Sequence, residues 1–214
     1  MKEIIILAFV VFIFTDFKPG YNTASNENVK IATSVNQKLN RVINGRNQCA
    51  IIKGHPFSNQ AKIDTFKLVY NCENLEDSMV FRIIGSSGEM IYERRFLGIG
   101  FYDYSRPWFE YITDPKRGRD FDPDKLSSQI SDSLHKADLK YIKLRMNKFF
   151  NDENFISNPM SKIDKDMFIK DNYKEISGDS TLIGFSHTLF VGGGSEMIAY
   201  SKKIKKVLLI VSSD

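Results

Sequence analysis

An uninterrupted apolar run close to the amino terminus is the feature that most constrains this chain. The run spans residues 4–14 and is preceded by Lys2. A membrane-spanning helix needs about 20 apolar residues, whereas the core of a secretory signal peptide needs about 7–15 after a positive start. Small residues that suit cleavage follow at Thr23, Ala24 and Ser25. The sequence therefore predicts a signal peptide over residues 1–25, no stable transmembrane span, and export to the periplasm or the extracellular space.

Two features of the same region leave alternatives open. Glu3 offsets the charge of Lys2, and the stretch between Phe14 and Ser25 is long for a cleavage region. An uncleaved anchor or a buried first strand or helix also fits such a pattern. The chain contains no Asn-x-Ser/Thr glycosylation site, which favours a bacterial exported protein over a secreted glycoprotein.

The length and charge predict one globular domain after the signal peptide. The chain has 214 residues, of which 42% are hydrophobic and 26% charged, with a net charge of +4. This is the composition of a folded domain rather than a disordered chain. The short basic clusters at 116–119 and 202–206 are small, and acidic residues surround the first, so no nucleic-acid partner is expected. We expect a single domain over 26–214, with 26–40 forming either a short amphipathic helix or a mobile tail.

Alternating and apolar runs predict strands before and after one long helix. Strands are expected at 49–52, 65–72, 79–84, 89–96, 181–191, 196–200 and 205–211. A Gly-Ser loop at 85–88 indicates a hairpin, and Asp122-Pro123 indicates the start of a helix that continues to about residue 150. Its expected apolar face consists of Leu126, Ile130, Leu134, Ala137, Tyr141 and Leu144. The fold class is α+β: a largely antiparallel sheet of about six or seven strands packed against one long central helix. The apolar last strand is expected at the centre of that sheet.

The two cysteines are predicted to form a disulfide. Cys49 and Cys72 lie on neighbouring expected strands, and antiparallel pairing of those strands brings them roughly opposite each other. An oxidising compartment favours the bridge. A nucleophilic thiol assisted by a histidine is the functional alternative, but a reactive thiol needs an accessible electropositive setting.

The segment 96–111 is the richest in aromatic residues and includes the only tryptophan of the chain. Charged residues alternate with these rings, a combination found in grooves that bind peptides, sugars or proteins. The predicted ligand-binding residues are Tyr102, Tyr104, Arg106, Trp108 and Glu110. Strict alternation places Tyr102, Tyr104 and Arg106 on one face. The alternative is that the aromatic side chains form core and sheet-edge packing around a turn.

No catalytic residue, metal site or cofactor is predicted. The acidic run from Asp120 to Asp124 lacks the glycine and the final carboxylate of a calcium loop, so that helix capping explains it better. Ser186 and His187 are neighbours on an expected strand and therefore point to opposite faces. The triple glycine at 192–194 lacks the lysine of a phosphate loop.

These observations favour an exported binding protein of the bacterial cell envelope over an enzyme. We expect an interaction protein, in the class of inhibitor or immunity proteins, that binds an envelope protein or glycan through segment 96–111. The alternative is an exported hydrolase that acts on a glycan or peptide through paired carboxylates, with Asp103 and Glu110 as candidates.

Overall fold

The computed structural model describes residues 47–117, 121–189 and 194–213. The predicted signal peptide, 1–25, and the predicted helix or tail, 26–40, lie outside the described residues. Among those described, the expected α+β class is confirmed, but the strands form two four-stranded antiparallel sheets rather than one larger sheet.

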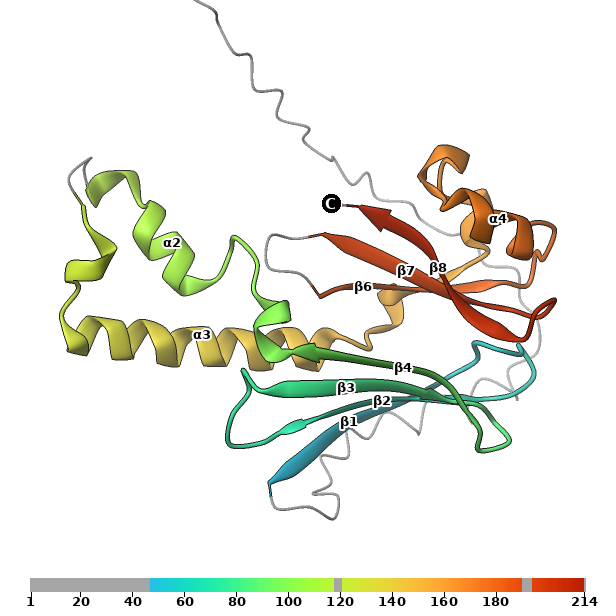
Figure 1. Ribbon diagram of the computed structural model, residues 1–214, viewed down its shortest axis with the longest axis horizontal. Helices are drawn as coiled ribbons and strands as arrows, with labels where there is room; N and C mark the ends of the chain where they lie inside the picture. Colours follow the sequence, from blue (N-terminus) through green and yellow to red (C-terminus); the bar gives the residue numbers. More distant parts are fainter. Residues whose placement is uncertain (1–46, 118–120, 190–193, 214) are drawn as a thin grey trace, which may run out of the picture. The chain divides into compact units, whose positions relative to one another are not determined.

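The first sheet is a meander of four consecutive strands (Figure 1). They are β1 (Gln48–His55), β2 (Asp64–Asn71), β3 (Ser78–Ile84) and β4 (Met90–Leu97). On β2, buried and half-buried residues alternate strictly, because one face of the sheet meets the core and the other faces outward. The predicted hairpin is β3 and β4, and its loop closes with a hydrogen bond from the main-chain N–H of Gly85 to the carbonyl of Glu89.

The second sheet is a meander of β5 (Phe155–Ser157), β6 (Ile183–Thr188), β7 (Ser195–Ser201) and β8 (Lys206–Ser213). The last strand is therefore an edge strand, not the central strand expected from its apolar run. The run is explained by contacts with two clusters: Val207 and Leu209 pack against the main core, while Leu208 and Ile210 belong to a smaller cluster beside the helix α4 (Lys170–Ile176).

Two further α-helices, α2 (Pro107–Thr113) and α3 (Ser128–Lys148), connect the sheets. Figure 1 shows α2 beside the amino-terminal half of α3, beyond the ends of the strands. The long helix is therefore not central: within residues 128–141 only Asp138 is buried, and its carboxyl-terminal part alone enters the core. None of the described helices combines the length and the apolarity that crossing a membrane requires.

The start and the buried face of α3 also differ from expectation. Asp122 caps a 3-10 turn over Pro123–Lys125, and Ser127 caps α3 itself. The expected apolar stripe left Ile130 and Leu144 exposed, and the buried stripe is Asp138, Ile142 and Met146. The reason is that, among the described residues, the first half of the helix packs against α2 rather than against the face of a sheet.

Phenylalanine side chains from both sheets and from the end of α3 form the main core. Phe149 and Phe150 follow α3 directly and enter the space between the sheets, where their rings contact Phe81 and Phe185. The ring centroid of Phe66 on β2 lies within 6.1 Å of the centroids of several other phenylalanine rings in the same core. Such edge-to-face contacts stabilise a core beyond the area that they bury. The end of α3 is therefore held firmly against both sheets.

The predicted disulfide between Cys49 and Cys72 is confirmed. It joins β1 to the residue after β2, with the two Cα atoms 5.4 Å apart. We expect the double substitution Cys49→Ser and Cys72→Ser to lower the free energy of unfolding by roughly 3 kcal/mol, because the bridge closes a loop of 23 residues. Urea denaturation measures this. A similar midpoint for the oxidised protein and the double variant would contradict the prediction.

Candidate functional site

The aromatic segment leaves β4 through a tight turn rather than continuing as a strand. The 3-10 turn covers Gly98–Phe101. Its glycines are required by close packing: a Cβ at Gly98 would lie 1.6 Å from the carbonyl oxygen of Leu75, and one at Gly100 would lie 2.7 Å from that of Leu189. The alternation expected for this segment is therefore wrong, and the chain passes from this turn towards α2.

Three of the five predicted ligand-binding residues make contacts inside the protein. The guanidinium of Arg106 lies over the rings of Tyr102 and Trp108, at 4.4 and 4.8 Å from their centroids. Its Nη1 is 3.8 Å from Oδ2 of the buried Asp138, whose Oδ1 accepts the main-chain N–H of Trp108 at 2.9 Å. Burial, together with a 2.8 Å hydrogen bond donated to Glu76, raises the pKa of Tyr102. These contacts attach α2 to α3 and to the first sheet.

The other two predicted residues, Tyr104 and Glu110, are exposed. The side chain of Tyr104 is 63% exposed, and its ring lies 5.0 Å from that of Phe109. No residue of α2 is buried, so Trp108 and Phe109 are also partly open to solvent. We call Tyr104, Trp108 and Phe109 the aromatic surface. The segment is thus divided between anchoring contacts and an accessible face.

Asp103, a candidate carboxylate of the hydrolase alternative, is held by three donors. Its Oδ1 accepts the Tyr141 hydroxyl at 2.6 Å and the main-chain N–H of Ser105 at 2.8 Å, and its Oδ2 lies 3.6 Å from Nη2 of Arg145. Burial acts to raise the pKa of Asp103, but these donors outweigh it and lower the pKa. A general acid needs a raised pKa, so this arrangement gives the paired-carboxylate alternative little support.

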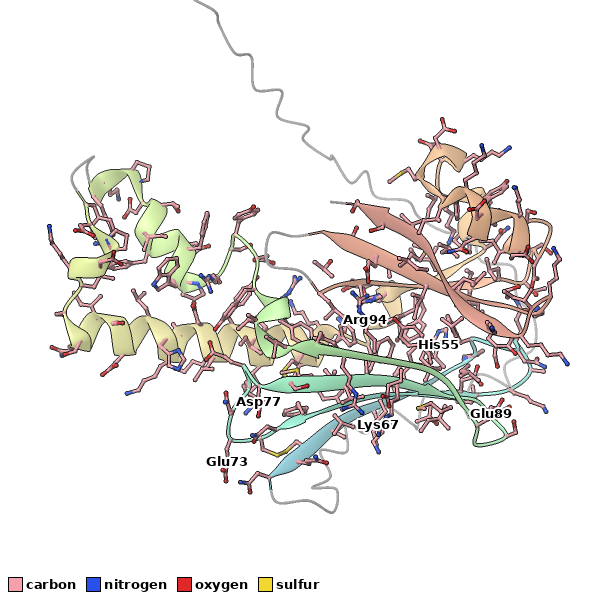
Figure 2. The ribbon with its side chains drawn as sticks, viewed as in Figure 1. His55, Lys67, Glu73, Asp77, Glu89 and Arg94 are labelled. Atoms are coloured by element: carbon pink, nitrogen blue, oxygen red, sulfur yellow. A yellow bond between two sulfur atoms is a disulfide. The ribbon has the colours of Figure 1, made fainter. Side chains whose placement is uncertain are left out.

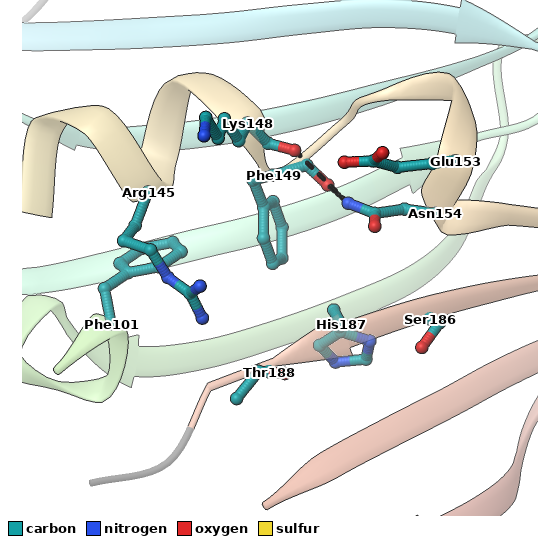
Figure 3. Close-up of a pocket in the computed structure, with 9 residues that line it drawn as sticks. All are labelled: Phe101, Arg145, Lys148, Phe149, Glu153, Asn154, Ser186, His187 and Thr188. Atoms are coloured by element: carbon teal, nitrogen blue, oxygen red, sulfur yellow. Dashed lines mark hydrogen bonds between the residues drawn. The ribbon is translucent and has the colours of Figure 1, made fainter. Parts of the chain in front are cut away.

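A cleft of about 290 Å³ lies between the end of α3 and β6 (Figure 3). Arg145, Lys148 and Phe149 border it from the helix side, and Ser186, His187 and Thr188 from the strand side. The remaining lining residues are Phe101, Glu153 and Asn154. In Figure 3, the Arg145 side chain extends from the helix towards β6, and Glu153 lies at the other end of the cleft.

A cluster of charged and polar side chains, of which Glu196 and His187 are buried, lies next to this cleft and links the sheets. Arg94 on β4 pairs with Glu196 on β7, whose Oε2 is also 3.4 Å from Nε2 of His187. The His187 side chain is fully buried and stacks on Phe185 at 14° between the ring planes. Figure 2 shows Arg94 on the side of β4 that faces the second sheet. Because the imidazole is enclosed, this cluster acts as a structural bridge between the sheets.

The cleft residues were not among those predicted from the sequence. Arg145 and Lys148 lie in the last turn of α3, where basic residues are common because they complement the helix dipole. Their presence therefore gave no specific signal of a site. Ser186 and His187 point to opposite faces as predicted, because His187 faces the aromatic core.

Within the described residues, no three His, Cys, Asp or Glu side chains gather closely enough to hold a metal ion. Comparisons with known proteins add no identification: the chain matches no protein-family model, and neither a curated protein nor a solved structure is significantly similar to it.

Proposed function

We propose that the protein is exported and binds a protein partner of the cell envelope through the aromatic surface. The exposed Tyr104 ring, paired with Phe109 at 5.0 Å, is the observation that carries this proposal. Tyrosine, tryptophan and phenylalanine supply large contact areas at protein interfaces at little entropic cost. Inhibitor and immunity proteins are the class of binding protein that fits this description.

The way in which α2 is held supports the proposal. Arg106 is fixed between two rings and close to Asp138, so α2 has a defined position although it buries no residue. A surface that is already ordered loses less conformational entropy on binding. Glu110 is exposed in the first turn of α2 and supplies the polar rim of such an interface.

Export is part of the proposal and rests on two observations. The opening apolar run has the length of a signal-peptide core, and the disulfide suits an oxidising compartment. Cell fractionation followed by amino-terminal sequencing tests it directly. Cleavage near residue 25 supports export, whereas intact protein in the cytosol with its first methionine retained contradicts it.

Tyr104→Ser is expected to weaken partner binding by about thirtyfold, because truncating a central interface tyrosine costs about 2 kcal/mol. The side chain is 63% exposed, so the folded state itself should not change. A photo-crosslinking residue at position 104, in cells, first identifies the partner. Calorimetry with the purified partner and the variant then measures the loss.

The matched control is Ile63→Ser, which removes a side chain that is 58% exposed outside the aromatic segment. It should leave the affinity unchanged. Equal affinities for all three proteins would remove the aromatic surface as the binding site. Specific binding to purified envelope glycan but to no protein would instead establish the glycan partner as the correct one.

A further inference from the structure

The cleft exists because the second sheet is incomplete beside α3. β5 pairs only with residues 183–185 of β6. Before β5, the chain turns through the 3-10 helix Asp152–Asn154, so no described strand continues the pairing along residues 186–188. The last turn of α3 lies across this gap, and the Asn154 amide donates to the carbonyls of Lys148 and Phe149 (Figure 3). The edge of β6 that β5 leaves open at residues 186–188 therefore forms one wall of the cleft.

This wall offers main-chain and side-chain hydrogen-bonding groups. In an antiparallel ladder, alternate residues direct their main-chain groups to alternate sides. β7 uses one side of residues 186–188, and the described residues place no strand on the other. Ser186 and Thr188 border the cleft, and their hydroxyls have no hydrogen-bond partner among the described residues.

The opposite wall carries two basic residues, Arg145 and Lys148, and Glu153 lies at the other end of the cleft. Arg145 is oriented by Asp103 at 3.6 Å, and the Asp103 carboxylate is itself fixed by Tyr141 at 2.6 Å. Lys148 borders the same cleft one turn further along α3 and has no ion pair among the described residues. A guanidinium that points into a small cleft, with a lysine on its border, favours a carboxylate at the end away from Glu153.

The size and the lining of the cleft limit the ligand. A volume of about 290 Å³ is at the lower end for ligand pockets, which suits one or two terminal residues of a chain rather than an oligosaccharide. The rings of Phe101 and Phe149 contribute to the lining but are themselves almost fully buried. Most of the accessible groups are therefore polar.

We propose that this cleft binds the free carboxyl end of a peptide, with the carboxylate on Arg145 and Lys148 and the peptide main chain along residues 186–188 of β6. Addition of a short extended segment to an open strand edge is a common mode of peptide recognition, and a charged end fixes its register. The site is separate from the aromatic surface, so it stands or falls independently of the function proposed above.

The probe is acetyl-Ala-Ala-Ala with a free carboxylate, compared with its carboxyl-terminal amide. The full chain, labelled with ¹⁵N, is titrated with each peptide and followed by NMR. We expect the acid to bind with a dissociation constant of about 1 mM and to shift the amide signals of residues 186–188. The amide should bind at least about tenfold more weakly, because it lacks the charge-assisted hydrogen bonds.

Variants on the helix separate this proposal from non-specific attraction. Arg145→Gln and Lys148→Gln should each weaken binding of the acid peptide about tenfold. The double variant should bind the acid peptide and the amide peptide with equal affinity. Lys148 is exposed, so its variant tests the site even if Arg145→Gln perturbs the fold. Lys143→Gln is the matched control, because it removes the same charge from the same helix outside the cleft and should change nothing.

Three results would overturn the proposal. The first is equal binding of the acid and the amide to the unmodified protein. The second is the absence of shifts at residues 186–188 with peptide at about 10 mM, well above the expected dissociation constant. The third is displacement of the peptide by an equal concentration of propionate, which would show a site for simple carboxylates that makes no use of the strand edge.

Discussion

Asp64→Ala is expected to lower the free energy of unfolding by about 3–5 kcal/mol, a large share of the roughly 5–15 kcal/mol of an ordinary domain. The Asp64 side chain is completely buried at the start of β2. Its Oδ2 accepts the main-chain N–H groups of Phe57 and Ser58, at 3.2 and 2.6 Å, and its Oδ1 accepts that of Ser86 at 3.0 Å. Alanine leaves all three donors without a partner.

The size of this effect follows from what the carboxylate joins. Phe57 and Ser58 belong to the loop between β1 and β2, whereas Ser86 belongs to the turn of the hairpin formed by β3 and β4. One side chain therefore holds two loops that no strand pairing connects. An unsatisfied buried donor costs about 1–3 kcal/mol, and Phe57 is too deeply buried to be hydrated instead.

Two milder variants test this explanation. The Ser58 hydroxyl also donates to Asp64, at 3.0 Å, so Ser58→Ala removes one of four hydrogen bonds and should cost about 1 kcal/mol. Asp64→Asn keeps the shape of the side chain but turns an amide N–H₂ towards one set of donors. Its loss in the free energy of unfolding should therefore lie between those of Ser58→Ala and Asp64→Ala. Thermal and urea denaturation, followed by circular dichroism, measure the order of stability among the three variants. Equal losses for all three variants would contradict it.

Local features of the fold were predictable because they depend on neighbours in the sequence. The hairpin of β3 and β4 follows from two β-rich runs around a Gly-Ser loop, and the Cys49–Cys72 bridge follows from pairing adjacent strands. The division into two sheets was not predictable in the same way. An inward-facing residue on β2 and one on β6 show the same pattern whether they belong to one sheet or face each other across a core.

The candidate sites show the same limit. The sequence drew attention to segment 96–111, but which of its aromatic residues are exposed depends on Asp138 and Glu76, which lie far from it in the sequence. The cleft depends on the length of β5, because a strand only three residues long leaves one edge of β6 open at residues 186–188. No periodicity in the sequence records where such a short strand stops.

Arg94→Met is the second substitution for which we expect a large effect. It should lower the free energy of unfolding by about 3–5 kcal/mol. Arg94 neutralises Glu196, whose side chain is only 7% exposed. Without the arginine, the carboxylate stays buried, and the charged partner that the described residues leave to it is His187, 3.4 Å away. Glu196→Gln should cost less, because the amide still accepts hydrogen bonds and Arg94, 27% exposed, remains in contact with water.

Arg95→Met is the matched control for this pair. Arg95 is the next residue on β4, so its side chain points to the opposite face, where it is 68% exposed and pairs with Glu93 at 3.3 Å. Exposed ion pairs contribute little, so this variant should unfold at nearly the same urea concentration as the unmodified protein. Comparable losses of unfolding free energy in Arg94→Met and Arg95→Met would show that positive charge on β4, and not the ion pair with Glu196, stabilises the fold.

The pH dependence of the Glu196→Gln effect tests the same cluster in another way. Burial acts to raise the pKa of Glu196, but the neighbouring His187 ring and the hydrogen bond from Arg94 outweigh burial and lower the pKa. A carboxyl group with a lowered pKa adds stability above its unfolded pKa of about 4.3 and loses it as the pH falls through the folded value. The difference in unfolding free energy between the unmodified protein and Glu196→Gln should therefore shrink as the pH falls below about 4. A difference that grows on acidification would mean that Glu196 is protonated in the folded protein, and the ion pair between the sheets would have to be abandoned.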